Sequence, residues 1–102
     1  MALENSAKNY LRITNIHESE SSNVSISFNI YSTKQIRNNW DTIDQRFHNV
    51  LYQTEIFTST DFNDILYTNA SVLAENNKTK RHTAAAYIIL KTREPYNIMT
   101  DN

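Results

Sequence analysis

The run from Thr83 to Thr92 is the most apolar stretch of a polar chain, and it constrains the fold more than any other segment. The alanines Ala84 to Ala86 favour a helix, and Thr83 is placed to act as its N-cap. The apolar residues of this run cover more than one helical stripe, so the helix needs partners on most of its sides. A buried strand over Tyr87 to Leu90 is the alternative, because periodicity alone does not exclude it.

Pro95 limits this helix on its C-terminal side. The residue before a proline is pushed out of the α-helical region, so we expect the helix to span 83–93 and a tail to cover 95–102. A second helix is predicted over 61–75, with Ser59 or Thr60 as its N-cap. Its apolar residues recur at helical spacing. They are Phe62, Ile65, Leu66, Val72 and Leu73.

Three segments are predicted to be strands, at 9–17, 23–32 and 47–58. The clearest is 23–32, where apolar and polar residues alternate as in a strand with one buried face. Its apolar residues are Val24, Ile26, Phe28 and Ile30. The alternation of 9–17 becomes irregular after Thr14. In 47–58, the set that contains Tyr52 and Ile56 is expected to face the core.

These elements predict an α+β fold in a single domain, with a small antiparallel sheet of about three strands packed on two C-terminal helices. The chain has 102 residues, and a domain of that size buries roughly two-thirds of its unfolded surface. Residues 1–8 show no periodicity and are expected to form a flexible arm, which in an assembly crosses a neighbour. The segment 32–45 is either a short helix, capped by Asn39 or Asp41, or a long loop.

The composition excludes several classes of site. The chain has no glycine, which excludes a P-loop, a Rossmann fingerprint and a nucleophile elbow in their usual forms. Turns that need a positive φ are expected to use Asn or Asp. The absence of cysteine excludes disulfides and thiolate metal sites. His17, His48 and His82 lack metal-ligand spacing, so we expect no metal site. Because the glycine motifs are absent and the carboxylates give no paired acid/base signal, we also expect no cofactor and no catalytic residues.

The same composition bears on partners. The formal net charge of −1 argues against nucleic acid as a partner bound through bulk charge. The sequence has no apolar run long enough for a membrane span and no apolar signal-peptide core, so we expect neither.

Two groups of residues are candidates for an interface. Trp and Tyr are enriched at binding hot spots, although core packing is an equal alternative for each of them. A small basic cluster precedes the last predicted helix, at a helix start where the dipole disfavours cations. A carboxylate from a neighbouring chain would offset this unfavourable charge. The candidates are Tyr31, Trp40, Tyr52 and Tyr96, with Lys78, Lys80 and Arg81 from the basic cluster.

The two ends of the chain resemble a family of small proteins encoded among the structural genes of tailed bacteriophages. The first stretch opens Met-Ala-Leu and continues through Tyr10-Leu11-Arg12-Ile13 to the strand that ends at Tyr31. The second is Ala86-Tyr87-Ile88-Ile89-Leu90-Lys91-Thr92, which is followed by Glu94 and a final Thr-Asp-Asn. Pro95 and Tyr96 stand where members of that family usually carry an aromatic residue.

The resemblance implies a virion structural protein of the tail or baseplate, assembled in the host cytoplasm. It also implies several copies around the tail axis, in contact with other tail and baseplate proteins and without catalysis. A homo-oligomeric ring needs head-to-tail contacts, for which the first and third strands and the two terminal segments are candidate edges. Two other functions stay open on the sequence alone. One is a small phage-encoded inhibitor of a host protein, and the other is a small nucleic-acid-binding protein that uses Arg12, Lys34, Arg37 and residues 78–82.

Overall fold

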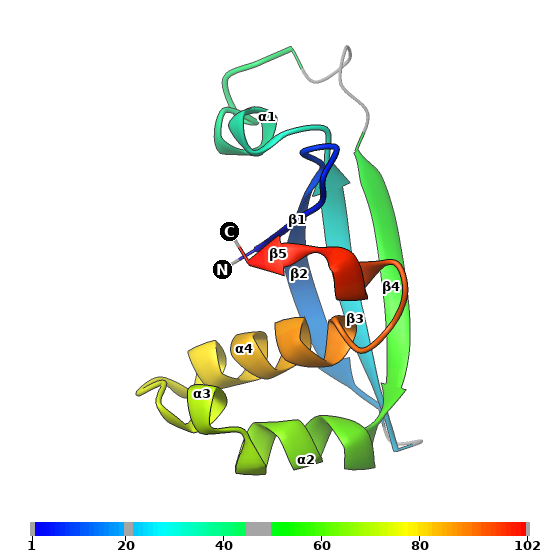
Figure 1. Cartoon of the computed structure of the whole chain (residues 1–102), viewed down its shortest axis with the longest axis vertical. Coiled ribbons are helices and arrows are strands. Elements are labelled where there is room, and N and C mark those ends of the chain that lie inside the picture. The colour runs from blue at the N-terminus through cyan, green and yellow to red at the C-terminus, as the bar shows by residue number, and fades with distance from the viewer. Residues whose placement is uncertain (1, 20–21, 45–49, 102) are drawn as a thin grey trace.

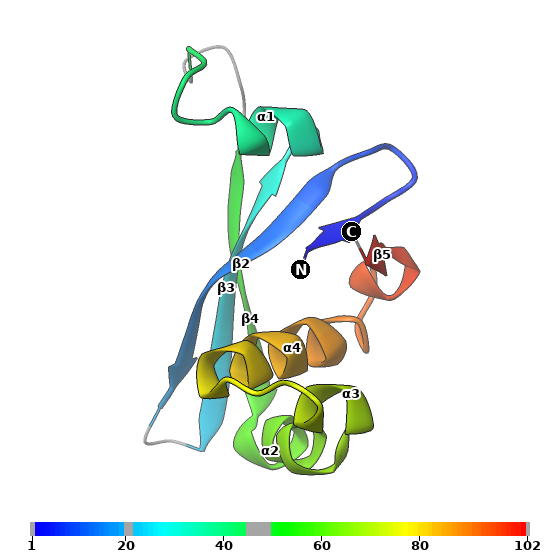
Figure 2. The same ribbon diagram turned by 90° about the vertical axis from the view of Figure 1, so that its left-hand side faces the viewer.

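The computed structural model describes residues 2–19, 22–44 and 50–101 (Figure 1). Within these residues an antiparallel sheet has the strand order β4-β3-β2-β1-β5. The helices α2, α3 and α4 lie on one face of it, and α1 lies at one end of the long strands (Figures 1 and 2). The α+β class is therefore confirmed. The elements are β1 (Leu3–Glu4), β2 (Tyr10–Glu18), β3 (Asn23–Tyr31), α1 (Lys34–Asn38), β4 (Leu51–Thr58), α2 (Ser59–Thr68), α3 (Ala70–Leu73), α4 (Lys78–Leu90), a 3-10 turn (Tyr96–Ile98) and β5 (Thr100–Asp101).

The sheet has five strands in the described residues instead of about three, because the expected arm and tail each supply a short strand. Leu3 pairs with Leu11 on one side and with Asp101 on the other, so β1 is an interior strand. The side chain of Leu3 is buried in the core. Strands of two residues have no period to detect, which is why the sequence pattern did not reveal them. Residues 1 and 102 of the expected arm and tail lie outside the described residues.

Strand β2 lies between β1 and β3, so the prediction that the first long strand forms an edge is wrong. Its register shifts at Thr14, because Ile13 pairs with Phe28 and Asn15 pairs with the preceding residue, Ser27. The extra residue keeps Ile13 and Ile16 on the same face, where both pack against the core. This bulge is the physical basis of the irregular alternation in the sequence.

Strand β3 shows the predicted alternation, with Val24, Ile26 and Phe28 buried against the helices. The predicted orientation of β4 is wrong. Phe57 is buried and Glu55 is half-buried on the helix-covered face, whereas Tyr52 and Ile56 are exposed on the opposite face. Glu55 is tolerated on the helix-covered face because it finds hydrogen-bond partners there, and Gln53, on the same side of the strand, remains exposed. The first three residues of the predicted strand, 47–49, lie outside the described residues.

The final helix is confirmed, including residues 87–90, but it begins earlier and ends sooner than predicted. Asn77 is its N-cap, and its side chain accepts hydrogen bonds from the backbone of Thr79 and Lys80. Thr83 lies inside the helix and donates its hydroxyl proton to the Thr79 carbonyl at 3.0 Å. An asparagine cap therefore supplies the helix start that we assigned to Thr83.

The predicted helix 61–75 is divided at Asn69. This residue ends α2 and caps α3, because its side chain accepts hydrogen bonds from the backbone of Ser71 and Val72. Thr58, rather than Ser59 or Thr60, caps α2. Side-chain acceptors of this kind compete with the helical hydrogen bonds, which explains the break within an otherwise helical pattern.

A second, smaller apolar cluster lies under α1. Its buried members are Ala2, Tyr10 and Tyr31, whose side chains alternate away from the face that carries Leu11 and Phe28. The short helix that we considered for 32–45 forms as α1, capped by Thr33 rather than by Asn39 or Asp41.

Two described residues have a positive φ, Lys8 at 67° and Ser22 at 66°. The expectation that Asn or Asp would take these positions is therefore wrong. Lys8 closes the turn between β1 and β2, where its N–H donates to the Asn5 carbonyl at 3.0 Å. The backbone hydrogen bonds of that turn, rather than the intrinsic preference of the side chain, hold this conformation.

Replacing Asn77 by alanine should lower the free energy of unfolding by about 0.5–2 kcal/mol, because two backbone N–H groups lose their acceptor. Thr83→Ala is the matched control and should change it by less than about 0.5 kcal/mol, since Thr83 sits inside the helix. Urea unfolding followed by circular dichroism measures both. The reverse order of effects would place the helix start at Thr83.

Replacing Leu3 by alanine should cost about 2–5 kcal/mol of unfolding free energy, as for other fully buried leucines. Leu73→Ala removes the same atoms from an exposed position on α3 and should cost less than about 1 kcal/mol. Urea titration of the two variants separates a core strand from a flexible arm. Equal, small losses would mean that residues 1–8 do not pack.

Candidate interaction surface

The face of the sheet opposite α2, α3 and α4 is polar, exposed along β2 and β4 and half-buried along β3 between them. We call it the outer face. The register aligns its residues in rows across the strands, such as His17, Ser25 and Ile56, and the hydroxyls of Ser27 and Thr54 lie 3.0 Å apart. It consists of Arg12, His17, Ser25, Ser27, Asn29, Tyr52, Thr54 and Ile56.

Strand β4 forms one edge of the sheet and has eight residues, whereas β5 at the other edge has two. The edge strand contains neither lysine nor proline, the residues that natural proteins commonly use to block strand addition. Tyr52 is 72% exposed and Ile56 is 53% exposed on its outer side. A long edge strand with large exposed side chains is a surface suited to pairing with another strand.

The aromatic candidates separate into two groups. Tyr31 is buried under α1, where its ring meets that of Trp40 edge to face with centroids 5.4 Å apart. Trp40 is half-buried in the same cluster. Tyr96 is 3% exposed and packs edge to face on Phe28. Tyr31 and Tyr96 are thus core residues of this chain, and Tyr52 is the aromatic candidate that the structure exposes most.

A polar cluster ties the segment after α4 to the edge strand. We call it the Glu55 cluster. The Tyr96 hydroxyl lies 3.0 Å from Glu55 Oε1 and 3.2 Å from Gln53 Oε1, and it donates to these oxygens. Arg93 Nη1 is 3.0 Å from Glu55 Oε2, and the guanidinium lies 3.9 Å from the centroid of the Phe57 ring. Arg93 Nη2 also donates to the Ile56 carbonyl at 2.6 Å.

The surroundings of Tyr96 in the Glu55 cluster raise the pKa of its phenol. Burial, aided by the hydrogen bond to the Glu55 carboxylate and by its negative charge, raises the pKa of Tyr96 to about 12. Burial also raises the pKa of Tyr87, against the opposing effect of the hydrogen bond from the Ile13 N–H. Neither phenol is poised to exchange a proton near neutral pH, so both act as structural hydrogen-bonding groups.

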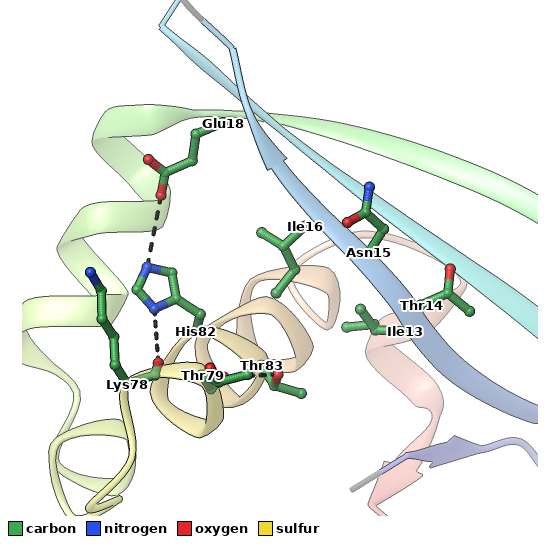
Figure 3. Close-up of a pocket in the computed structure, with 9 residues that line it drawn as sticks. All are labelled: Ile13, Thr14, Asn15, Ile16, Glu18, Lys78, Thr79, His82 and Thr83. Carbon is green, nitrogen blue, oxygen red and sulfur yellow. Dashed lines mark hydrogen bonds and ion pairs between the residues drawn. The ribbon is translucent and has the colours of Figure 1, made fainter.

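The basic cluster lies in the first turn of α4, beside an open groove of about 390 Å³ between this helix and β2 (Figure 3). Lys78 and Lys80 are exposed, and Arg81 Nε donates to the Glu75 carbonyl at 2.6 Å. A carboxylate from a neighbouring chain stays a prediction. Within the chain, the Glu18 carboxylate lies 3.9 Å from His82 Nε2. It offsets part of the positive charge at this helix start.

The groove is lined by polar side chains that include those of His82 and Thr83. His82 Nδ1 lies 2.9 Å from the Lys78 carbonyl, so that nitrogen carries a proton and the other faces Glu18. The Thr83 hydroxyl is committed to the Thr79 carbonyl within the helix.

Across residues 2–19, 22–44 and 50–101, no group of three or more His, Asp or Glu side chains could hold a metal ion. In the same residues, every helix is too short or too polar to cross a membrane. Comparison of the chain with protein-family models, with curated proteins and with solved structures gives no match. The function is therefore inferred from the residues themselves.

Three residues of this surface were not candidates in the sequence. Arg93 and Glu18 acquire their roles from partners that are 38 and 64 positions away in the chain, since they face Glu55 and His82. Thr54 is an ordinary strand residue until the sheet order makes β4 an edge. In the sequence, the alternation of apolar and polar residues indicated an outward-facing polar surface only for β3.

Replacing Tyr96 by phenylalanine should lower the free energy of unfolding by about 1–3 kcal/mol at pH 8, because the Glu55 and Gln53 oxygens lose a buried donor. Urea unfolding measures the loss. Tyr67→Phe, at an exposed position, is the control and should change stability by less than about 0.5 kcal/mol. An equal effect of the two substitutions would contradict the hydrogen bonds of Tyr96.

The stabilities of wild type and Tyr96→Phe should also depend differently on pH. The folded chain keeps the Tyr96 proton up to about pH 12, whereas the unfolded chain loses it near the ordinary pKa of 10.0. The unfolded state therefore binds fewer protons between these values, and the contribution of the hydroxyl, complete below pH 10, falls as the pH rises toward 12. Urea titrations of wild type and Tyr96→Phe should converge over this interval. A constant difference would contradict the raised pKa.

Proposed function

We propose that this chain is a non-enzymatic structural protein of a bacteriophage tail or baseplate, which acts by self-association and by docking to neighbouring tail proteins. The observation that carries the proposal is the exposed edge strand β4, with Tyr52 and Ile56 on its outer side. A surface of this kind recognises another polypeptide through backbone hydrogen bonds and a few side chains. It needs no catalytic group, no metal and no cofactor.

The resemblance of the two ends of the chain to small phage structural proteins supports the same proposal. The residues that carry it are brought together by the fold, because Leu3 pairs with Asp101 and Glu4 pairs with Thr100 (Figure 1). The Ala-Tyr-Ile-Ile-Leu part of the second stretch lies in α4, which is buried against the sheet. Stretches distant in sequence thus belong to one packed unit, as expected if they are inherited together.

In the proposed virion, copies of the chain surround the tail axis and contact other tail or baseplate proteins. A ring requires a head-to-tail contact, in which two different surfaces of the chain meet. The groove beside α4 and the outer face lie on different sides of the sheet and are available for such contacts. Rim charges such as Lys78 and Lys80 would set the orientation of docking more than its strength.

The purified chain should form a discrete oligomer. The average mass, measured by light scattering behind a sizing column, should rise with protein concentration toward the mass of that oligomer. The chain should also be present in particles of the phage that encodes it, measured by mass spectrometry of purified virions. Expression of an unrelated protein of similar size during the same infection is the control for contamination. Absence from virions, together with co-purification with one host protein, would replace this proposal by the inhibitor function.

A further inference from the structure

The backbone groups that β4 presents at its edge follow from the pairing with β3. The Ser59 N–H donates to the Ser22 carbonyl at 2.9 Å, one residue beyond the pair Asn23–Thr58. That bond makes Asn23–Thr58 a non-hydrogen-bonded pair of the antiparallel ladder. Because the two kinds of pair alternate, the N–H and C=O groups of Tyr52, Thr54 and Ile56 point away from β3.

The sequence of the edge strand is symmetric in character about Thr54. It reads Leu-Tyr-Gln-Thr-Glu-Ile-Phe over residues 51–57, with two apolar residues, a polar residue, the central threonine, a polar residue and two apolar residues. An antiparallel partner with the same sequence, centred on Thr54, would face like with like throughout. Tyr52 would face Ile56 of the second copy, an aromatic and β-branched pair that stabilises antiparallel strands.

The charges of the edge strand are compatible with this register. Glu55 is the sole ionisable carboxylate of the strand, and the centred pairing places it opposite Gln53 of the second copy rather than opposite another Glu55. Its charge is already offset by Arg93, at 3.0 Å. Arg93 also donates to the outward carbonyl of Ile56, but a carbonyl oxygen has two lone pairs and can accept a second hydrogen bond.

We propose that β4 pairs with β4 of a second copy, antiparallel and centred on Thr54, so that two sheets join into one across a twofold axis. This inference deepens the self-association in the proposed function and rests on it. A twofold contact uses the same patch on both copies and closes after two. A ring of the kind proposed above therefore needs a further contact on another surface, and the dimer is the unit that builds it.

Cross-linking tests the register directly, because the natural chain has no cysteine and one introduced thiol is unique. In the proposed dimer the two Thr54 residues form a hydrogen-bonded pair with Cα atoms about 5.5 Å apart, within the range that a disulfide spans. Oxidised Thr54→Cys should form a covalent dimer at least about tenfold faster than His17→Cys, an exposed outer-face control on β2, whose thiols meet by collision.

Tyr52→Cys alone should cross-link no faster than the His17→Cys control, because residue 52 faces residue 56 of the second copy. The double variant Tyr52→Cys/Ile56→Cys should cross-link as fast as Thr54→Cys. Efficient cross-linking of Tyr52→Cys alone, or failure of Thr54→Cys, would overturn the register.

Thr54→Pro removes the outward N–H and leaves the bonds of β4 to β3, which is the position where an edge strand tolerates proline. It should abolish the dimer on the sizing column while circular dichroism stays unchanged, with Thr60→Pro in the first turn of α2 as the control for proline itself. A dimer that survives Thr54→Pro, or a wild type that stays monomeric at all concentrations, would overturn the inference. The proposed function fails separately, by absence of the chain from virions whether or not the dimer forms.

Discussion

Helix α4 has apolar side chains on most of its circumference, and the need to cover them sets the places of the other elements. It contacts β2 on one side and α2 and α3 on the other. Ala85, Ala86 and Leu90 are fully buried, and the alanines allow the close approach of the neighbouring elements. Tyr87 adds a directional contact, because its hydroxyl accepts the Ile13 N–H at 2.9 Å. Ile13 lies beyond the part of β2 that pairs with β1. The helix therefore supplies the hydrogen-bond acceptor for a backbone N–H that β1 does not reach.

The parts of the fold that the sequence predicts are those with a long, regular period. The alternation of β3 specifies a strand with one buried face, and the alanine-rich run of α4 specifies a helix that is covered on most of its sides. The two short strands β1 and β5 have no such period, since they exist through pairing between residues almost a hundred positions apart. The inward face of β4 was missed for a similar reason. Half-buried Glu55 is acceptable on the helix-covered face because Tyr96 and Arg93 reach it, and the local pattern does not contain those partners.

The candidate surface was predictable in its chemistry but not in its position. Composition indicated tyrosine and tryptophan as anchors, yet the same ring chemistry suits a core, and the structure buries Tyr31 and Tyr96 while it exposes Tyr52. The basic residues of α4 were visible in the sequence, but the carboxylate of Glu18 that faces His82 was not. Whether a strand is an edge depends on the order of all strands, so the importance of β4 emerges only with the complete sheet.

The unequal edges of the sheet determine what kind of assembly strand addition can produce. Open-ended fibres need two usable edges on each copy, since every added strand must present the next one. Here β4 offers eight residues and β5 offers two, and Asp101 of β5 is held by Lys91 at 3.5 Å. Pairing through β4 consumes the long edge of both copies and leaves only short edges outside. The same asymmetry that leaves β4 open would therefore limit the proposed association to a closed pair, the building unit proposed above.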